Sequence, residues 1–393
     1  MRLRHPDGST VHLAYCTNVH PAEDLTGIHH QLAAYGEPVR DLLGTGRLGL
    51  GLWLPHDAAS TLDTDPAAVA RLRAELTARG LEVVTLNGFP YRGFHEPVVK
   101  RAVYAPDWTD PRRLEHTLRL ARVLAALLPD DAARASISTL PLGWRTPWTA
   151  RHRDRARHAL DRLAEGLAGI AHRTGRHIRV GLEPEPGCAI ATVEDACTGP
   201  DALDGVDTRH IGVCLDVCHL AADFEEPRTA LRRLDAAGLP VVKAQLSSAL
   251  QADAPADPAV RRALETFREP RFLHQTRARA LPRPHRWDDL ADALDDPAGQ
   301  GTGPWRVHFH IPVHTEPEPP LTSTRSVLAA TLRALAAGPR PVTDHLEVET
   351  YTWSVLPGAA RPTGPRGLAE GIAAELDWVR GQLRTHGLRE ETP

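Results

Sequence analysis

Three short apolar segments of the chain end in polar residues whose types suit metal binding or proton transfer. The run IRVGLEPEPG ends at Glu183, and the run IGVCLDVCHL ends at Asp216, with His219 three residues further on. The run VVKAQLSSAL carries Lys243 and Gln245 at alternate positions. Carboxylate and amide oxygens bind divalent cations, whereas carboxylates, imidazoles and amines transfer protons. Metal chemistry and acid–base chemistry are therefore the first hypotheses.

A fourth run, HLEVETYTW, places Glu347 and Glu349 on one face, because side chains alternate along a strand. Carboxylates that converge with an amide, and in one alternative with an imidazole, repel one another unless a cation lies between them. We therefore predict one divalent metal ion, Mg²⁺, Mn²⁺ or Zn²⁺, at this place. The alternative for any single carboxylate is a structural ion pair with one of the many arginines.

Further residues are candidates for substrate contacts. His308 and His310 share a face in RVHFHIPVH, and His310 is the stronger candidate; a surface hairpin with incidental histidines is the alternative. The ends of three other apolar runs supply His20, His56 and Asn87, which we expect to line a polyol-sized pocket. Among 46 basic residues only Lys100 and Lys243 are lysines, so the retention of Lys243 suggests that its shape or pKa matters.

Short apolar runs alternate with longer stretches of helical periodicity, which is typical of βα repeats. The predicted helices are 65–79, 110–128, 150–174 and 226–237, and each stops at a glycine, a proline or the next strand. The eight predicted strands are His12–His20, Leu48–Pro55, Glu82–Pro90, Ala135–Leu142, His177–Pro184, His210–His219, Val241–Ser247 and His345–Trp353.

Eight βα repeats predict an α/β fold, a closed (β/α)₈ TIM barrel, in one domain that spans residues 1–393. The segment 249–340 between the seventh and eighth strands is longer than a connection between two barrel strands needs to be. We interpret them as an elaborated insertion over the C-terminal face of the barrel, where active sites of such barrels lie. In the alternative, HFHIPVH is itself a barrel strand and one of the eight is not.

Composition excludes several classes of protein. The chain has 393 residues, a formal net charge of -4 and 42% hydrophobic residues, so we expect a globular protein with no nucleic-acid partner. No apolar run is long enough to span a membrane and the first residues lack a signal-peptide pattern, so we expect a cytoplasmic location. Five cysteines without a CxxC pair indicate reduced thiols.

The motifs GLEPEPG and CLDVCH, followed by a strand with Gln and a strand with Glu, resemble the xylose isomerase-like barrel superfamily of sugar isomerases and epimerases. The resemblance implies that one divalent metal is held by Glu183, Asp216, Gln245 and Glu349, with Glu347 as the alternative last ligand. It also implies that His219, the histidine of D-x-x-H, contacts metal or substrate.

The segments AYCTNVHP, FLHQT, VHFHIPVH and LEVETYTWSVLP resemble more narrowly the EboE group, which is associated with secondary-metabolite traffic. The resemblance implies an isomerase or epimerase acting on a small polyhydroxylated, sugar-like metabolite. Glu183 and Glu349 would then be the acid–base pair, while Lys243 or His219 would polarise a substrate oxygen.

Two rival functions remain at this point. One is a carrier that binds such a metabolite in the same pocket without converting it. The other is a phosphodiesterase or abasic-site endonuclease of the same barrel type, which would need several metals and a basic face that an acidic chain does not suggest. The sequence carries no indication of the oligomeric state.

Overall fold

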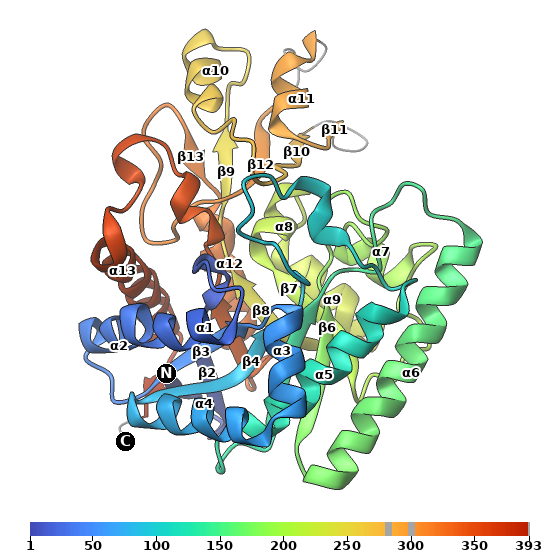
Figure 1. Ribbon diagram of the computed structural model, residues 1–393. Coiled ribbons are helices and arrows are strands. Elements are labelled where there is room, and N and C mark those ends of the chain that lie inside the picture. Colours follow the sequence, from blue (N-terminus) through green and yellow to red (C-terminus); the bar gives the residue numbers. More distant parts are fainter. Residues whose placement is uncertain (280–284, 298–302, 392–393) are drawn as a thin grey trace.

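The computed structural model describes residues 1–279, 285–297 and 303–391, and its central element is a closed barrel of eight parallel strands (Figure 1). Each strand pairs with the next along the chain, and β14 pairs with β2 to close the ring. The strands are β2 Thr10–Cys16, β3 Leu48–Trp53, β4 Leu81–Asn87, β5 Arg134–Thr139, β6 His177–Leu182, β7 Ile211–Asp216, β8 Val241–Leu246 and β14 His345–Val348. The predicted TIM barrel is confirmed.

Helices cover the outer face of this barrel and side chains fill its interior, so β3, β4, β7 and β8 are buried over their whole length. The four predicted helices are present, and their ends follow the sequence signals: Asp110 caps α5 and Gly175 ends α6 with a φ of 68°. The helices are α1 Leu25–Gln31, α2 Glu37–Leu43, α3 His56–Thr64, α4 Pro66–Ala78, α5 Pro111–Leu127, α6 Ala150–Thr174, α7 Val193–Thr198, α8 Val217–Ala222, α9 Pro227–Ala236, α12 Arg325–Ala336 and α13 Gly364–Thr385.

Several predicted strands run too far at their C-terminal ends. The sixth prediction, His210–His219, stops at Asp216 because the Asp216 side chain accepts a hydrogen bond from the His219 backbone N–H and caps α8. The eighth prediction, His345–Trp353, stops at Val348, and a 3₁₀ turn begins at Tyr351. Glu183, Asp216, His219 and Glu349 therefore lie at or just beyond the strand ends, on the C-terminal rim, whereas Lys243 and Glu347 lie within β8 and β14.

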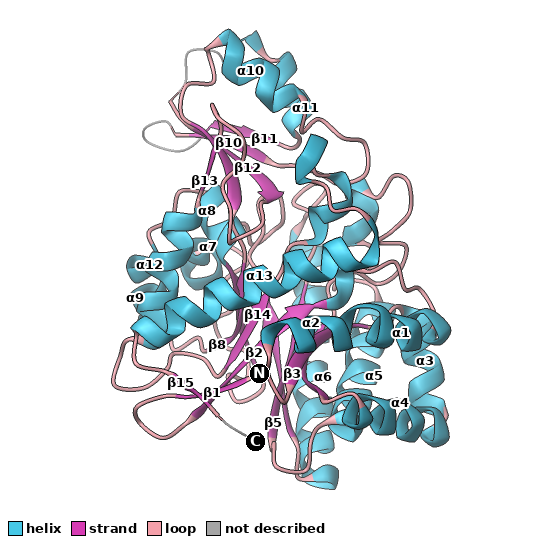
Figure 2. Ribbon diagram, turned by 90° about the vertical axis from the view of Figure 1, so that its left-hand side faces the viewer, coloured by secondary structure: helices cyan, strands magenta, loops and turns pink. Residues whose placement is uncertain are grey.

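A second sheet follows β8 and stands above the barrel, with α10 and α11 at its far end (Figures 1 and 2). Its antiparallel order is β11-β10-β12-β9-β13, so HFHIPVH belongs to this sheet and the alternative of a barrel strand is wrong. Residues 280–284 and 298–302 of the expected insertion lie outside the described residues. The elements are β9 Ala249–Ala252, α10 Pro258–Glu265, β10 Thr276–Ala278, β11 His285–Trp287, α11 Leu290–Asp295, β12 Trp305–His310 and β13 Thr322–Ser323.

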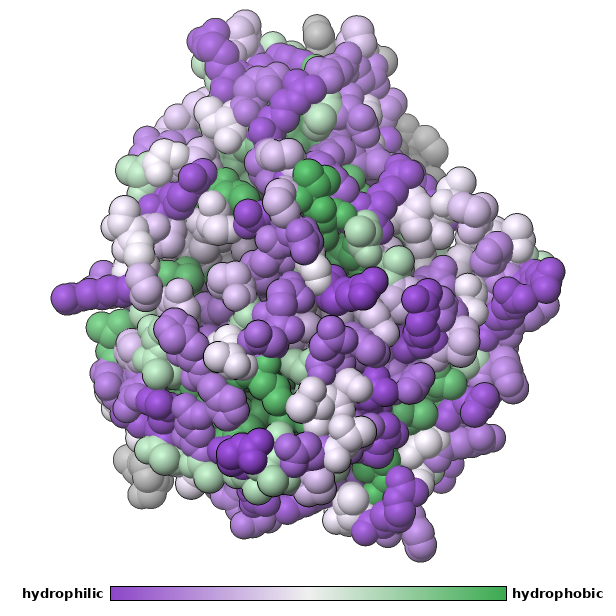
Figure 3. Space-filling model, viewed as in Figure 1, coloured by the Kyte–Doolittle hydropathy of each residue, from purple (hydrophilic) through white to green (hydrophobic). Residues whose placement is uncertain are grey.

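The chain ends meet at the opposite side of the barrel, where β1 (Arg2–Arg4) pairs with both β2 and β15 (Arg389–Glu390). The face seen in Figure 3 is mostly hydrophilic, with separate hydrophobic spots. Among the helices that the structure describes, none is both long and apolar enough to cross a bilayer. All five cysteines are free thiols, as predicted.

Candidate metal centre and its cavity

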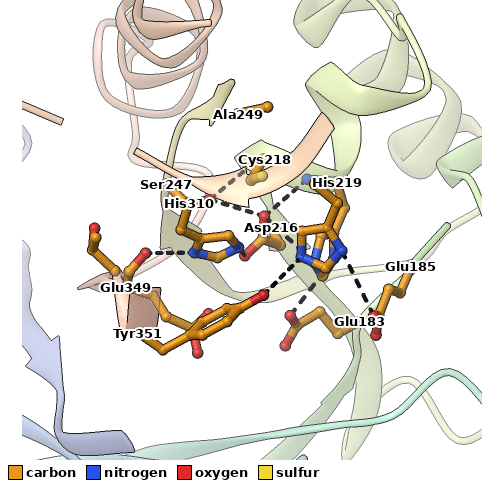
Figure 4. Close-up of polar contacts among 12 residues, drawn as sticks. Glu183, Glu185, Asp216, Cys218, His219, Ser247, Ala249, His310, Glu349 and Tyr351 are labelled. Carbon is orange, nitrogen blue, oxygen red and sulfur yellow. Dashed lines mark hydrogen bonds and ion pairs between the residues drawn. The ribbon is translucent and has the colours of Figure 1, made fainter. Parts of the chain in front are cut away.

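Three carboxylates meet at the C-terminal rim of the barrel (Figure 4). Glu183 follows β6, Asp216 ends β7 and Glu349 follows β14, and one oxygen of each lies within 4.8 Å of the others. All three are at most 4% exposed. Burial, and then repulsion from Glu349 and Asp216, raises the pKa of Glu183 well above its ordinary value. Such a cluster is electrostatically unfavourable without a cation.

Unpaired atoms around these carboxylates fit a metal ion. Glu183 Oε2, Asp216 Oδ2 and both amide atoms of Gln245 are buried and have no hydrogen-bond partner. Gln245 lies beside Asp216 in the pairing of β7 with β8. Buried polar atoms are rarely left unpaired, and the three oxygens among these atoms are ligands of the kind that divalent cations prefer. The predicted set of Glu183, Asp216, Gln245 and Glu349 therefore fits such an ion.

His310 joins this set from β12, outside the barrel. Its Nδ1 lies 2.7 Å from the backbone oxygen of Glu349, which accepts only, so Nδ1 carries the proton. Its Nε2 has no hydrogen-bond partner and lies 4.0 Å from Asp216 Oδ2. Burial lowers the pKa of His310 to about 4, so the ring is neutral at neutral pH, as a metal ligand must be. The predicted substrate contact is thus also a potential ligand.

Neighbouring side chains hold the carboxylates in place. Glu349 Oε1 accepts hydrogen bonds from Asn18 Nδ2 at 2.7 Å and from Asn87 Nδ2 at 2.8 Å. Asp216 Oδ1 accepts from the Ser247 hydroxyl at 2.8 Å, which leaves Oδ2 free. Partners of this kind orient ligands in metal sites. Asn87, predicted as a substrate contact, lines the cavity and also orients Glu349.

His219 and His308 lie next to the carboxylate cluster and line the same cavity. His219 Nδ1 donates to the Pro184 oxygen at 3.1 Å, and His219 Nε2 lies 3.0 Å from His308 Nε2. His308 Nδ1 is 2.7 Å from Gln275 Oε1. His219 is also 3.7 Å from Glu183 Oε1, so the histidine of D-x-x-H is placed to contact a substrate oxygen or the ion.

Lys243 and Glu347 form a separate ion pair inside the barrel. Lys243 Nζ lies 2.9 Å from Glu347 Oε2, and both side chains are fully buried. Burial alone would lower the pKa of Lys243, but the Glu347 carboxylate raises it above its ordinary value. Neither residue lines the cavity beside the carboxylate cluster. The geometry therefore favours Glu349 over Glu347 as the last ligand and gives Lys243 no direct contact with a substrate.

His20 and His56 lie away from the cavity lining. His20 stacks on Tyr35 at a centroid distance of 4.0 Å and contacts the Tyr15 hydroxyl at 3.2 Å. His56 begins α3 and lies 2.8 Å from Asp57. His20 follows the short 3₁₀ turn Thr17–Val19, and His56 is the first residue of α3. The geometry does not support their predicted substrate contacts.

The cavity beside the cluster has polar and apolar walls and a free volume of about 60 Å³. Three polar residues that the sequence did not single out take part in it: Tyr104 donates to Glu185 at 2.5 Å, and Gln275 Nε2 donates to the Tyr104 hydroxyl at 2.8 Å. Glu185 was visible in GLEPEPG as a second carboxylate. Tyr104 ends the 3₁₀ helix Lys100–Tyr104 and Gln275 lies in an irregular segment, and neither segment has a periodic pattern, so no local signal marked them.

Residues 48–258 match the family model described as xylose isomerase-like TIM barrel. The chain belongs to this family. The match covers β3 to β8 and includes Glu183, Asp216 and Gln245, whereas His310 and Glu349 lie beyond it. No curated protein matches the chain.

Solved structures share the fold at low sequence identity. A candidate sugar phosphate isomerase/epimerase from Anabaena variabilis is 15% identical, with a TM-score of 0.52 over 96% of this chain and 100% of that one. D-allulose 3-epimerase from Methylomonas sp., in complex with D-allulose, is 17% identical, with a TM-score of 0.38 over 60% and 72%. The IOLI protein with a bound zinc atom is 12% identical, with a TM-score of 0.39 over 60% and 73%.

Proposed function

We propose that the protein is a divalent-metal-dependent isomerase or epimerase that acts on neighbouring hydroxyl and carbonyl groups of a small oxygen-bearing metabolite. The observation that carries the proposal is the set of buried, unpaired ligand atoms on Glu183, Asp216, Gln245 and His310 beside Glu349. Membership of the xylose isomerase-like family agrees with it. The narrower resemblance to the EboE group, and with it a role in secondary metabolism, remains a prediction.

The side chains around the cluster suit a proton shift between adjacent carbons. A divalent cation at this site would stabilise negative charge that develops on the substrate oxygens. Glu183 and Glu349 are the proposed acid–base pair, and both line the cavity. Asn18 and Asn87 hold Glu349 in one orientation. His219 and His308 line the cavity and are placed to bind a substrate oxygen.

Metal content tests the proposal first. We expect the wild-type protein to retain one equivalent of Mg²⁺, Mn²⁺ or Zn²⁺ after gel filtration, measured by elemental mass spectrometry, and the Glu183→Gln, Asp216→Asn double variant to retain none. Glu375→Gln is the matched control, because Glu375 is equally buried but hydrogen-bonds to Val313, Thr350 and Trp353 instead. A wild-type protein that takes up none of the three metals refutes the proposal.

Turnover is tested by exchange of carbon-bound hydrogen with deuterium oxide in a panel of hydroxy-carbonyl compounds. We expect exchange in the metal-loaded protein and its loss in Glu349→Gln. Ligand-dependent thermal stabilisation without exchange would instead support the carrier, which uses the same cavity but moves no proton.

A further inference from the structure

One wall of the cavity is built from an apolar cluster that is separate from the barrel core. The cluster contains Trp53, Phe94, Val99 and Phe272, with Val103 and Tyr351 packed against it. Five of these residues also line the cavity beside the carboxylates, and we call them the apolar wall: Phe94, Val99, Val103, Phe272 and Tyr351. Phe94, Val99, Val103 and Phe272 offer contact area to a ligand but no hydrogen bonds, and the Tyr351 hydroxyl, the one polar group of the wall, lies 3.4 Å from His308 Nε2.

The apolar wall reaches the proposed metal ligands directly. Phe94, Phe272 and Tyr351 come from three different loops, and their ring centroids lie 4.9 to 5.4 Å apart. The Tyr351 ring also lies 4.6 Å from the ring of His310. Figure 4 shows the Tyr351 side chain beside His310. A substrate whose oxygens lie at the carboxylate cluster therefore places its next atoms against these rings.

Several polar groups of the cavity are engaged with one another, whereas the unpaired ones, Asn18 Oδ1, Glu183 Oε2 and His310 Nε2, belong to the proposed metal ligands or to Asn18, which holds Glu349. Asn18 and Asn87 both donate to Glu349, and the Tyr104 hydroxyl donates to Glu185. Sugar hydroxyls that lie against Phe94, Val99, Val103 and Phe272 would lose their water and gain no partner from these four side chains, which is costly.

The charges of the cavity disfavour an anionic substituent. Glu183, Glu185 and Glu349 line it, and among the described lining residues Lys100 is the one lysine or arginine. Lys100 Nζ lies 2.6 Å from Asp289 and 3.3 Å from the Glu269 backbone oxygen, so its charge is already balanced. A phosphate away from the metal ligands would therefore meet carboxylates and, among the described lining residues, no free lysine or arginine.

We propose that the substrate is neutral and carries its pair of neighbouring oxygens on an apolar ring or chain, so that it is neither a free sugar nor a sugar phosphate. This inference rests on the proposed function and names its substrate class. The free volume of about 60 Å³ is smaller than a ring-sized body. An apolar substrate ring therefore enters only if Phe94 or Phe272 moves. The substrate ring then makes the apolar contacts that the two phenylalanine rings lose, whereas a hydroxylated substrate does not make them.

Hydroxamic acids that share one metal-binding head and differ in the body test the inference. Benzohydroxamic acid has an apolar body, threonohydroxamic acid a hydroxylated one, and phosphoglycolohydroxamic acid a phosphate. Titration calorimetry on the metal-loaded protein should give benzohydroxamic acid an affinity at least about tenfold higher than that of the other two. Equal or tighter binding of the hydroxylated or phosphorylated compound overturns the inference.

Variants of the apolar wall provide a second readout. Phe94→Asn and Phe272→Asn should each weaken benzohydroxamic acid about tenfold, whereas Phe94→Leu, which keeps an apolar side chain, should weaken it much less. In these variants the metal content should not change, and neither should the affinity for acetohydroxamic acid, which has the metal-binding head alone. These two measurements also show whether the site is folded. The control is Leu42→Asn, a residue that is 53% exposed on α2. Unchanged affinity in both asparagine variants overturns the inference.

The proposed function and the proposed substrate class are refuted by different results. If the metal-loaded protein binds acetohydroxamic acid but shows no preference for the apolar body, the substrate class is wrong and the metal-dependent function stands. If the protein takes up no metal, or the loaded protein binds none of the four compounds, the proposed function fails and the substrate class with it.

Discussion

Replacing Lys243 with methionine would leave the Glu347 carboxylate buried inside the barrel without its counter-charge. The two groups are 2.9 Å apart and neither has measurable solvent exposure. At that distance, with an effective dielectric constant of about 20, their attraction is roughly 6 kcal/mol. Part of this attraction offsets the cost of removing both charges from water. The free energy of unfolding that is lost when the pair is broken is therefore smaller than the attraction itself.

We therefore expect Lys243→Met and Glu347→Gln each to lower the free energy of unfolding by about 3–5 kcal/mol. The Lys243→Met, Glu347→Gln double variant should be more stable than either single variant, because it leaves one buried amide and no buried charge. The coupling energy of the double-mutant cycle should then be about 3 kcal/mol or more. Urea denaturation at neutral pH followed by circular dichroism measures all four proteins.

An exposed pair on the same chain is the matched control. Arg366 and Glu370 are 2.9 Å apart on α13, but their side chains are 91% and 50% exposed. The same substitutions there, Arg366→Met and Glu370→Gln, should couple by less than about 0.5 kcal/mol. A coupling energy below about 1 kcal/mol for Lys243 and Glu347 would refute the reasoning, because the pair would then contribute no more than exposed charges do. Loss of bound metal in folded Lys243→Met would contradict the placement of Lys243 outside the cavity.

Two further predictions concern packing and pH. Gly51→Ala should lower stability by about 3 kcal/mol, because a Cβ there would lie 1.8 Å from Glu347 Oε2. Gly381→Ala on α13 meets nothing within 4 Å and should not destabilise; equal melting temperatures of the two variants would contradict this. Burial raises the pKa of Glu375 to about 7 from an ordinary 4.5, so the folded state binds its proton more tightly and wild-type stability falls as the pH rises between these values. Glu375→Gln has no such proton to lose, so its stability lacks this fall. The free energy of unfolding of the wild type relative to the variant, measured by urea denaturation, should therefore decrease by about 2 kcal/mol from pH 5 to pH 8. A difference that stays constant over this range would contradict the raised pKa.

Local patterns in the sequence were sufficient for the barrel. The eight runs of buried residues, the four helices between them and the stop signals at Gly175 and after Leu127 all depend on neighbours in the chain. Asp216 and Glu183 were identifiable for the same reason, since an apolar run that ends in a carboxylate marks the rim of a parallel barrel. Strand ends were less predictable, because Asp216 serves both as the last strand residue and as the cap of α8.

What the tertiary structure alone decided is which of the candidates meet. Alternation placed Glu347 and Glu349 on one face, but the choice between them depends on Lys243, which lies on the neighbouring strand and pairs with Glu347. His310 reaches Asp216 because the second sheet stands above the barrel, and the apolar wall forms because three separate loops meet there. Contacts between residues far apart in the chain depend on how whole elements pack. The sequence by itself therefore determined the elements and the types of chemistry, whereas packing determined the site.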